Sequence, residues 1–402
     1  MNGTRRELVG GTVLWPDGRL APGTLVLDGD RVAALHQPGQ RPAAGRAAGT
    51  TVTDVSGCVV APGFVDTHVH GALGANFMAA DPDATDEAAA RLISSHLARG
   101  GVTSCVAATA SVDLTRLTRS LRGLAGMRGR LGGDGVELVG IHLEGPFLSA
   151  DFRGVHRPEY LLSPRPEFVD AVLSAGGDAL RIVTLAPELP FGLRAVAELT
   201  AAGVRVSMGH SAATYGQAVE AIEAGVRRAT HLFNGLPPIH HRQPGPVPAL
   251  LTDDRVHCEL VADGVHVAPE MIRFAAEVAG THRIVLVSDG ADVSGLPPGR
   301  HHRWEGTEVE VTNQGARTLG GSVAGSVARL GDAVRTAVQA AGVEVADALR
   351  MASANPADSL GLTDRGRFVP GTLADVVILD PELDVRTTIV RGDIVHHREE
   401  HS

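Results

Sequence analysis

Two histidines one residue apart, His68 and His70, follow a short apolar run that begins at Ala61-Pro62-Gly63. Side chains at positions i and i+2 of an extended strand point to the same side, so this spacing brings two imidazoles to one place. Imidazole nitrogens are common ligands of zinc and of other transition metals. A His-x-His pair alone is a weak signal. Its weight depends on which other groups the chain brings to the same place.

Four more groups that can bind a metal each follow a short run rich in β-branched residues. They are a glutamate, two histidines and an aspartate: Glu144, His210, His231 and Asp289. Mixed imidazole and carboxylate ligands suit several divalent ions. The sequence therefore predicts a divalent-metal centre, with zinc as the first choice and iron, manganese or cobalt as alternatives.

Eight apolar runs predict eight strands, and segments with helical periodicity separate most of them. The predicted strands are 63–67, 102–107, 136–143, 180–185, 204–208, 228–230, 256–261 and 284–288. Continuous hydrophobic strands that alternate with helices are typical of a parallel (β/α)8 barrel, which carries its active site at the carboxyl ends of the strands. The metal-competent residues fall at such ends. We therefore predict a TIM-like barrel, since an open doubly wound sheet would need a glycine-rich fingerprint that this sequence lacks.

Short strands with Asp-Gly and Pro-Asp-Gly turns occur near both ends of the chain. They predict that residues 1–60 and 361–402 together form one small, sandwich-like β domain, with a loop at 38–50. Residues 61–360 then form the catalytic barrel.

The amino-acid composition excludes several classes of partner and of catalytic chemistry. The chain has 402 residues, with 46 acidic and 36 basic side chains, which argues against nucleic-acid or anionic-membrane partners. We find no long apolar run or signal segment and expect a cytoplasmic protein. All 36 basic residues are arginine, which excludes chemistry that needs a lysine amine, such as Schiff-base and pyridoxal catalysis. The three isolated cysteines are expected to be buried thiols.

Five segments in order make the chain resemble the amidohydrolase superfamily and, within it, the N-acetylglucosamine-6-phosphate deacetylases. The segments are Leu143-Glu144-Gly145-Pro146-Phe147, Met208-Gly209-His210-Ser211, His231-Leu232-Phe233-Asn234, His240-His241-Arg242-Gln243-Pro244-Gly245 and Ala262-Asp263-Gly264-Val265-His266. The resemblance covers nearly the whole chain. It implies a homodimeric enzyme of amino-sugar metabolism that hydrolyses the acetamide of a small phosphorylated amino sugar.

The resemblance also implies a role for each metal-competent residue. The principal ion would be held by Glu144, His210 and His231. The first-strand pair, His68 and His70, would let a second ion share the glutamate. Asp289 would take a proton from the attacking water and return it to the leaving amine, which is the chemistry that amide hydrolysis requires.

Substrate contacts follow from the same resemblance. His266 matches a histidine that contacts the substrate and helps to polarise its carbonyl. Arg242 matches the phosphate-binding arginine, and a guanidinium fork suits a phosphate dianion. Further substrate contacts are expected at His156, Asn234, Gly235 and Leu319.

Three segments depart from the family pattern: Asp289-Gly290-Ala291 stands for Asp-Ala-Met, Arg242-Gln243-Pro244 for Arg-Glu-Pro, and Asn234-Gly235-Leu236 for Asn-Ala-Met. They remove no ligand and bear on the sugar epimer and the acyl group. Deacetylation of N-acetylgalactosamine 6-phosphate, or of an N-acyl compound without phosphate, is therefore an alternative. A metal-free binding protein on the same scaffold is a further one.

Overall fold

The structure, a computed structural model, describes residues 5–40, 49–83, 86–312 and 315–399. Residues 41–48 of the predicted loop and the terminal residues 1–4 and 400–402 of the predicted β domain lie outside the described residues. The central sheet contains eight parallel strands in chain order: β8 (Phe64–Val69), β11 (Val102–Ala108), β13 (Glu137–Glu144), β14 (Leu180–Leu185), β15 (Arg205–Met208), β16 (Val226–Ala229), β17 (His257–Leu260) and β18 (Ile284–Leu286). Each overlaps one predicted strand.

The two outer strands of this sheet meet. Val69 at the end of β8 forms a parallel bridge with Gly290, four residues after β18. The backbone amide of Asp289 also donates to the carbonyl oxygen of His68 at 2.9 Å. Sequential parallel strands that close on themselves define a (β/α)8 barrel, so the predicted fold class is confirmed.

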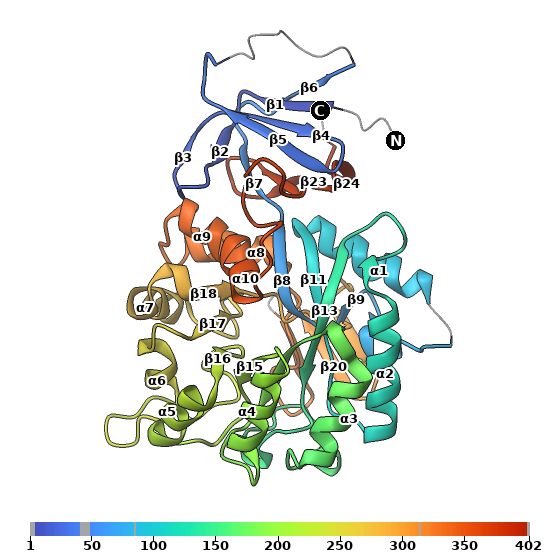
Figure 1. Cartoon of the computed structure of the whole chain (residues 1–402), viewed down its shortest axis with the longest axis vertical. Helices are drawn as coiled ribbons and strands as arrows, with labels where there is room; N and C mark the ends of the chain where they lie inside the picture. The colour runs from blue at the N-terminus through green and yellow to red at the C-terminus, as the bar shows by residue number, and fades with distance from the viewer. Residues whose placement is uncertain (1–4, 41–48, 84–85, 313–314, 400–402) are drawn as a thin grey trace.

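Helices cover the outside of the barrel (Figure 1). They are α1 (Glu87–Arg99), α2 (Leu114–Gly126), α3 (Pro166–Gly176), α4 (Gly192–Ala201), α5 (Tyr215–Ala224), α6 (Val247–Thr252), α7 (Pro269–Ala279), α8 (Leu330–Gln339), α9 (Val345–Ala352) and α10 (Ala354–Ser359). Helix α2 shows why such segments are helical. Its side chains Leu117, Leu121 and Leu124 recur every three or four residues and are fully buried, while the Asp113 side chain caps the amide of Arg116 at 2.9 Å. Within the described ranges, no helix combines the length and apolarity needed to cross a membrane.

Strands from both ends of the chain form two further sheets, drawn at the top of Figure 1. One has the order β5 (Arg31–His36), β4 (Thr24–Asp28), β1 (Arg5–Val9) and β6 (Thr51–Asp54). The other has the order β24 (Asp393–His397), β23 (Val385–Val390), β22 (Val376–Leu379), β7 (Val59–Pro62), β2 (Thr12–Leu14) and β3 (Leu20–Pro22). Leu8, Leu25, Phe368 and Val376 share the core between them. Strand β7 runs into barrel strand β8 across the single residue Gly63, which fixes the small β unit to the barrel.

A three-stranded antiparallel sheet follows the last barrel strand: β19 (Gly299–His302), β20 (Glu308–Thr312) and β21 (Gly315–Thr318). None of the strands predicted from the sequence lies in this segment. Buried Val309 and Val311 alternate with more exposed glutamates and pack with Ala316. This period of two is the usual signal of a half-buried strand and could have predicted β20. Shorter strands complete the fold: β9 (Gly71–Ala72), β10 (Ala75–Asn76) and β12 (Gly129–Arg130).

One buried histidine makes the stability of the fold depend on pH. His96 on α1 is 7% exposed, and its Nε2 lies 3.0 Å from Ser294 Oγ. Burial, with Arg329 and Arg99 nearby, lowers the pKa of His96 to about 4. The pKa of an unfolded histidine is about 6.5. Between these values the unfolded chain binds a proton that the folded chain does not, so stability falls as pH decreases from 6.5 to 4.

We expect the His96→Gln variant to lose less stability on acidification than the unmodified protein, by about 1 kcal/mol per pH unit in this window. Urea unfolding at pH 7, 6 and 5 measures the difference. The exposed Ser95 on the same helix provides a control, since Ser95→Ala removes no titratable group and should leave the slope unchanged. Equal slopes for His96→Gln and the unmodified protein would contradict the assignment.

Candidate active site

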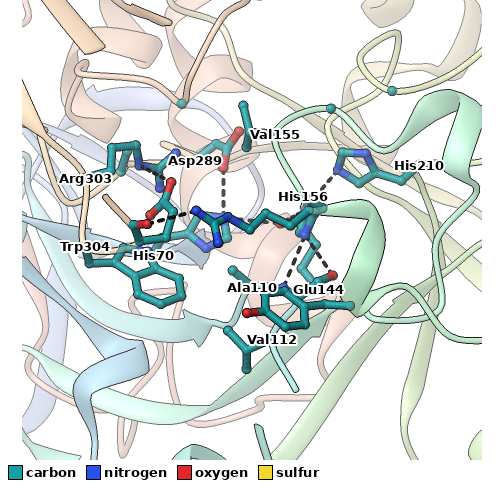
Figure 2. Close-up of a pocket in the computed structure, with 18 of the residues that line it drawn as sticks. His70, Ala110, Val112, Glu144, Val155, His156, His210, Asp289, Arg303 and Trp304 are labelled. Atoms are coloured by element: carbon teal, nitrogen blue, oxygen red, sulfur yellow. Dashed lines mark hydrogen bonds and ion pairs between the residues drawn. The ribbon is translucent and has the colours of Figure 1, made fainter. Parts of the chain in front are cut away.

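A cavity of about 370 Å³ opens at the carboxyl ends of the barrel strands. Figure 2 shows His70, Glu144, His156, His210 and Asp289 gathered around it. His231 lines the same cavity, and the His68 side chain is fully buried within contact distance of Glu144. The barrel thus brings together all six residues that the sequence marked as possible metal ligands.

Glu144 forms one compact cluster with His210 and His231, which we call the principal cluster. Glu144 Oε1 lies 3.0 Å from His231 Nε2 and 3.3 Å from His210 Nε2, and the two imidazole nitrogens are 3.0 Å apart. Two ligands of a tetrahedral zinc ion, each about 2.0 Å from the metal, are separated by about 3.3 Å. The donor atoms and their separations therefore fit one divalent ion.

A second group, the first-strand cluster, consists of His68, His70 and Asp289. The two Nε2 atoms lie 3.2 Å apart, and Asp289 Oδ1 is 3.5 Å from His68 Nε2 and 3.3 Å from His70 Nε2. Glu144 Oε2 is 3.3 Å from His70 Nε2, so one carboxylate borders both clusters. This arrangement fits a second divalent ion that shares Glu144 with the first.

The backbone at the strand ends is unusual and points these side chains inward. His210, His231 and Asp289 have positive φ angles of 48°, 28° and 48°. Few residues other than glycine adopt this conformation, and such strain is concentrated at functional sites. Backbone carbonyls then orient both histidine rings: the Nδ1 atoms lie 2.8 Å from Phe152 O and 3.1 Å from Asn234 O. Because each Nδ1 donates to a carbonyl, each Nε2 keeps its lone pair for a metal.

Charge balance keeps the two carboxylates ionised. Burial on its own would raise the pKa of Glu144 and Asp289, but attraction to His68 and hydrogen bonds from the other histidines outweigh it, so both pKa values lie below the usual range. Burial opposes protonation of the histidines, yet the neighbouring carboxylates raise the pKa of His68, His70 and His231. Metal binding at this site would therefore release protons.

Four of the six expected substrate contacts line the cavity: His156, Asn234, Gly235 and His266. His156 Nε2 lies 3.5 Å from Glu144 Oε2, and burial lowers the pKa of this histidine to about 4 despite the carboxylate. His156 is therefore neutral at pH 7. The imidazole of His266 is paired with Asp263, with 2.7 Å between Nδ1 and Oδ2.

The other two expected contacts, Arg242 and Leu319, lie outside the residues that line the cavity. Arg242 is exposed, and its guanidinium contacts His241 Nε2 at 2.7 Å. The Leu319 side chain is 61% exposed. Their roles in substrate binding stay predictions.

Several residues at the cavity were missed by sequence reasoning. Arg303 and Trp304 reach it from the loop between β19 and β20, and Arg116 comes from α2, with its guanidinium 4.8 Å from the Trp304 ring. Arg303 and Trp304 were missed because the sheet that carries their loop was not predicted. A charged pair inside the barrel, Arg228 and Glu259, was also missed, although charges within predicted apolar strands were a readable signal.

The sequence profile of the amidohydrolase family matches residues 59–395. N-acetylglucosamine-6-phosphate deacetylase of Bos taurus is 40% identical over 360 residues, which cover 86% of each chain. N-acetylgalactosamine-6-phosphate deacetylase of Escherichia coli O157:H7 is 37% identical over 345 residues, covering 86% of this chain and 89% of that relative. A mutant N-acetyl-D-glucosamine-6-phosphate deacetylase of Mycobacterium smegmatis, solved in complex with N-acetyl-D-glucosamine-6-phosphate, superposes with a TM-score of 0.88 at 38% identity, and the match covers 98% of this chain and 100% of the other. These similarities confirm the resemblance that the sequence motifs indicated.

We expect zinc to raise the unfolding temperature of the chelator-treated protein by several degrees, because an ion that binds only the folded chain stabilises it by about 4 kcal/mol at a thousandfold excess over Kd. Glu144→Gln should remove most of this increase, since Glu144 borders both clusters. The exposed Glu223 offers a control, and Glu223→Gln should retain the increase. Thermal unfolding with EDTA and with zinc measures it. A full increase in Glu144→Gln would exclude the shared carboxylate as a ligand.

Proposed function

The chain belongs to the amidohydrolase family, and from that premise we propose that it hydrolyses N-acetylglucosamine 6-phosphate to acetate and glucosamine 6-phosphate. The observation that carries this proposal is the pair of candidate ligand clusters around Glu144, one of which includes Asp289, at one cavity. Relatives with this activity match the chain over nearly its whole length. Acetate release from the substrate by the zinc-loaded protein tests it directly.

Each group of residues has a separate role in amide hydrolysis. A divalent ion held by either cluster would polarise the carbonyl of the acetamide and lower the pKa of the water bound to it. Asp289 accepts the proton of the attacking water at its carboxylate and passes it to the amine nitrogen as the C–N bond breaks. His68 and His70, within 3.5 Å of Asp289 Oδ1, favour the ionised form that can accept this proton.

His266 has its protonation pattern set by Asp263. A carboxylate is only an acceptor, so the His266 Nδ1 that contacts it must carry hydrogen. The second nitrogen, Nε2, can donate only when the ring is an imidazolium; in the neutral ring it accepts. We propose that His266 stabilises the developing oxyanion, a role that requires a hydrogen on Nε2.

The sugar epimer is open to a direct test. The chain is 40% identical to a deacetylase named for the glucosamine derivative and 37% identical to one named for the galactosamine derivative. N-acetylgalactosamine 6-phosphate is therefore the alternative substrate. A side-by-side measurement of kcat/KM with both epimers decides between them, and a higher value for the galactosamine derivative would replace our first assignment.

Zinc is the metal that we propose, because the ligand separations in the principal cluster fit a tetrahedral ion. Iron, manganese and cobalt are the alternatives, since they accept the same donors. Metal analysis of the protein as purified distinguishes them.

We propose a homodimer in the cytoplasm. Helices α4 and α5 pack against each other. Their exposed apolar side chains, Leu193, Tyr215 and Val219, offer a surface for contact with a second copy of the chain. A mass of one chain in solution would contradict the dimer.

The three cysteines are free, buried thiols, as expected, which agrees with a reducing compartment.

We expect Asp289→Asn to lower kcat by about 10²- to 10⁴-fold, because the amide cannot accept the proton of the attacking water. The circular dichroism spectrum should stay unchanged. Asp254 has a fully exposed carboxylate, so Asp254→Asn is the control that should keep full activity. Full activity in Asp289→Asn would remove this residue from the mechanism.

Arg242 can be tested for phosphate binding with and without the phosphate on the substrate. Loss of one charged hydrogen-bond donor costs about 10- to 100-fold in affinity. Arg242→Ala should therefore raise KM for N-acetylglucosamine 6-phosphate by that factor and leave turnover of N-acetylglucosamine unchanged. Arg116→Ala is the comparison, because Arg116 lines the cavity and Arg242 does not. A phosphate-specific loss in Arg116→Ala alone would transfer the role to Arg116.

A further inference from the structure

An ion pair lies inside the barrel, beneath the metal-binding residues. Arg228 on β16 and Glu259 on β17 are both 0% exposed, with Arg228 Nη2 2.6 Å from Glu259 Oε1. The guanidinium also donates to Thr67 Oγ1 at 2.9 Å and to the hydroxyl of Ser359. Burying two charges is expensive, and apolar side chains of similar size are often as stable. A contribution to stability therefore does not explain why these two charges lie in the barrel interior.

The second oxygen of Glu259 supplies that reason. Oε2 lies 3.2 Å from Nδ1 of His68 and accepts from the backbone amide of His231 at 3.4 Å. An ionised carboxylate only accepts hydrogen bonds, so Nδ1 of His68 carries the hydrogen. In the neutral ring Nε2 then holds a lone pair. That atom is the one that lies within 3.5 Å of His70 Nε2 and Asp289 Oδ1.

The contact differs from those of the principal cluster. His210 and His231 donate from Nδ1 to neutral backbone carbonyls, of Phe152 and Asn234. His68 alone of these three donates to a charged group. Hydrogen bonds to a carboxylate are roughly twice as strong as neutral ones, and a carboxylate behind a histidine makes the far nitrogen a better metal ligand.

We propose that Glu259, held in place by Arg228, is a positioning residue that orients His68 and sets the affinity of the first-strand cluster for a divalent transition-metal ion. The pair acts on this cluster and leaves the affinity of the principal cluster nearly unchanged. It determines how readily the chain binds a second ion. The proposal shares its metal chemistry with the proposed function, but it is tested without substrate, so either can fail alone.

Zinc titration of the whole chain against a chromophoric chelator tests the proposal. We expect Glu259→Gln to weaken one zinc-binding step by about 10- to 100-fold and to leave the other within a few-fold. His70→Gln, which removes a ligand of the same cluster, identifies the affected step. If zinc binding by Glu259→Gln equals that of the unmodified chain, the proposal is wrong, and it is equally wrong if the step lost is not the one lost in His70→Gln.

A control separates positioning from a general loss of stability. Glu137 forms a largely buried ion pair with Arg365, at 3.4 Å, away from the metal site. Glu137→Gln should lower the unfolding temperature without changing zinc affinity. If Glu259→Gln fails to fold, the double variant Arg228→Leu/Glu259→Leu, which leaves no unpaired charge, replaces it. The same selective weakening is expected, and unchanged zinc binding in the double variant would overturn the proposal.

Discussion

The structure depends on one electrostatic constraint: a carboxylate, Glu144, is held 3% exposed among imidazoles that come from three different strand ends. A buried carboxylate without partners would take up a proton. Here the surrounding histidines hold it ionised, and the carboxylates in turn raise the pKa of three of those histidines. Neither set of side chains would carry its charge without the other. The remainder of the barrel serves to bring them within hydrogen-bonding distance.

That requirement explains features that are costly for folding. Three strand ends adopt positive φ angles at residues with side chains, at His210, His231 and Asp289. Two charges, Arg228 and Glu259, occupy the barrel interior where apolar packing would suffice. The continuous hydrophobic strands and the amphipathic helices around them provide the stability that tolerates these costs.

The fold class and the convergence of the six candidate metal ligands could be predicted from the sequence because each rests on local patterns. The run that ends at His68 has a strand period, and barrel geometry then predicts where such runs converge. The substrate contacts were harder. A motif predicts that Arg242 binds phosphate. Its distance from the cavity lining depends on the fold of its loop, which the motif does not determine. Arg303 and Trp304 reach the cavity from a sheet whose alternation we overlooked. The pairing of Arg228 with Glu259 joins two strands and follows from no local pattern.

The closure of the barrel and the first-strand cluster use the same residues. His68 accepts the backbone hydrogen bond of Asp289, and the side chains of both belong to one cluster. They stand more than two hundred positions apart in the chain, so bringing them together carries a loop-closure entropy cost. The first-strand cluster is complete only once the last strand has docked. The pairing of the first and last strands therefore closes the barrel and completes this cluster at the same time.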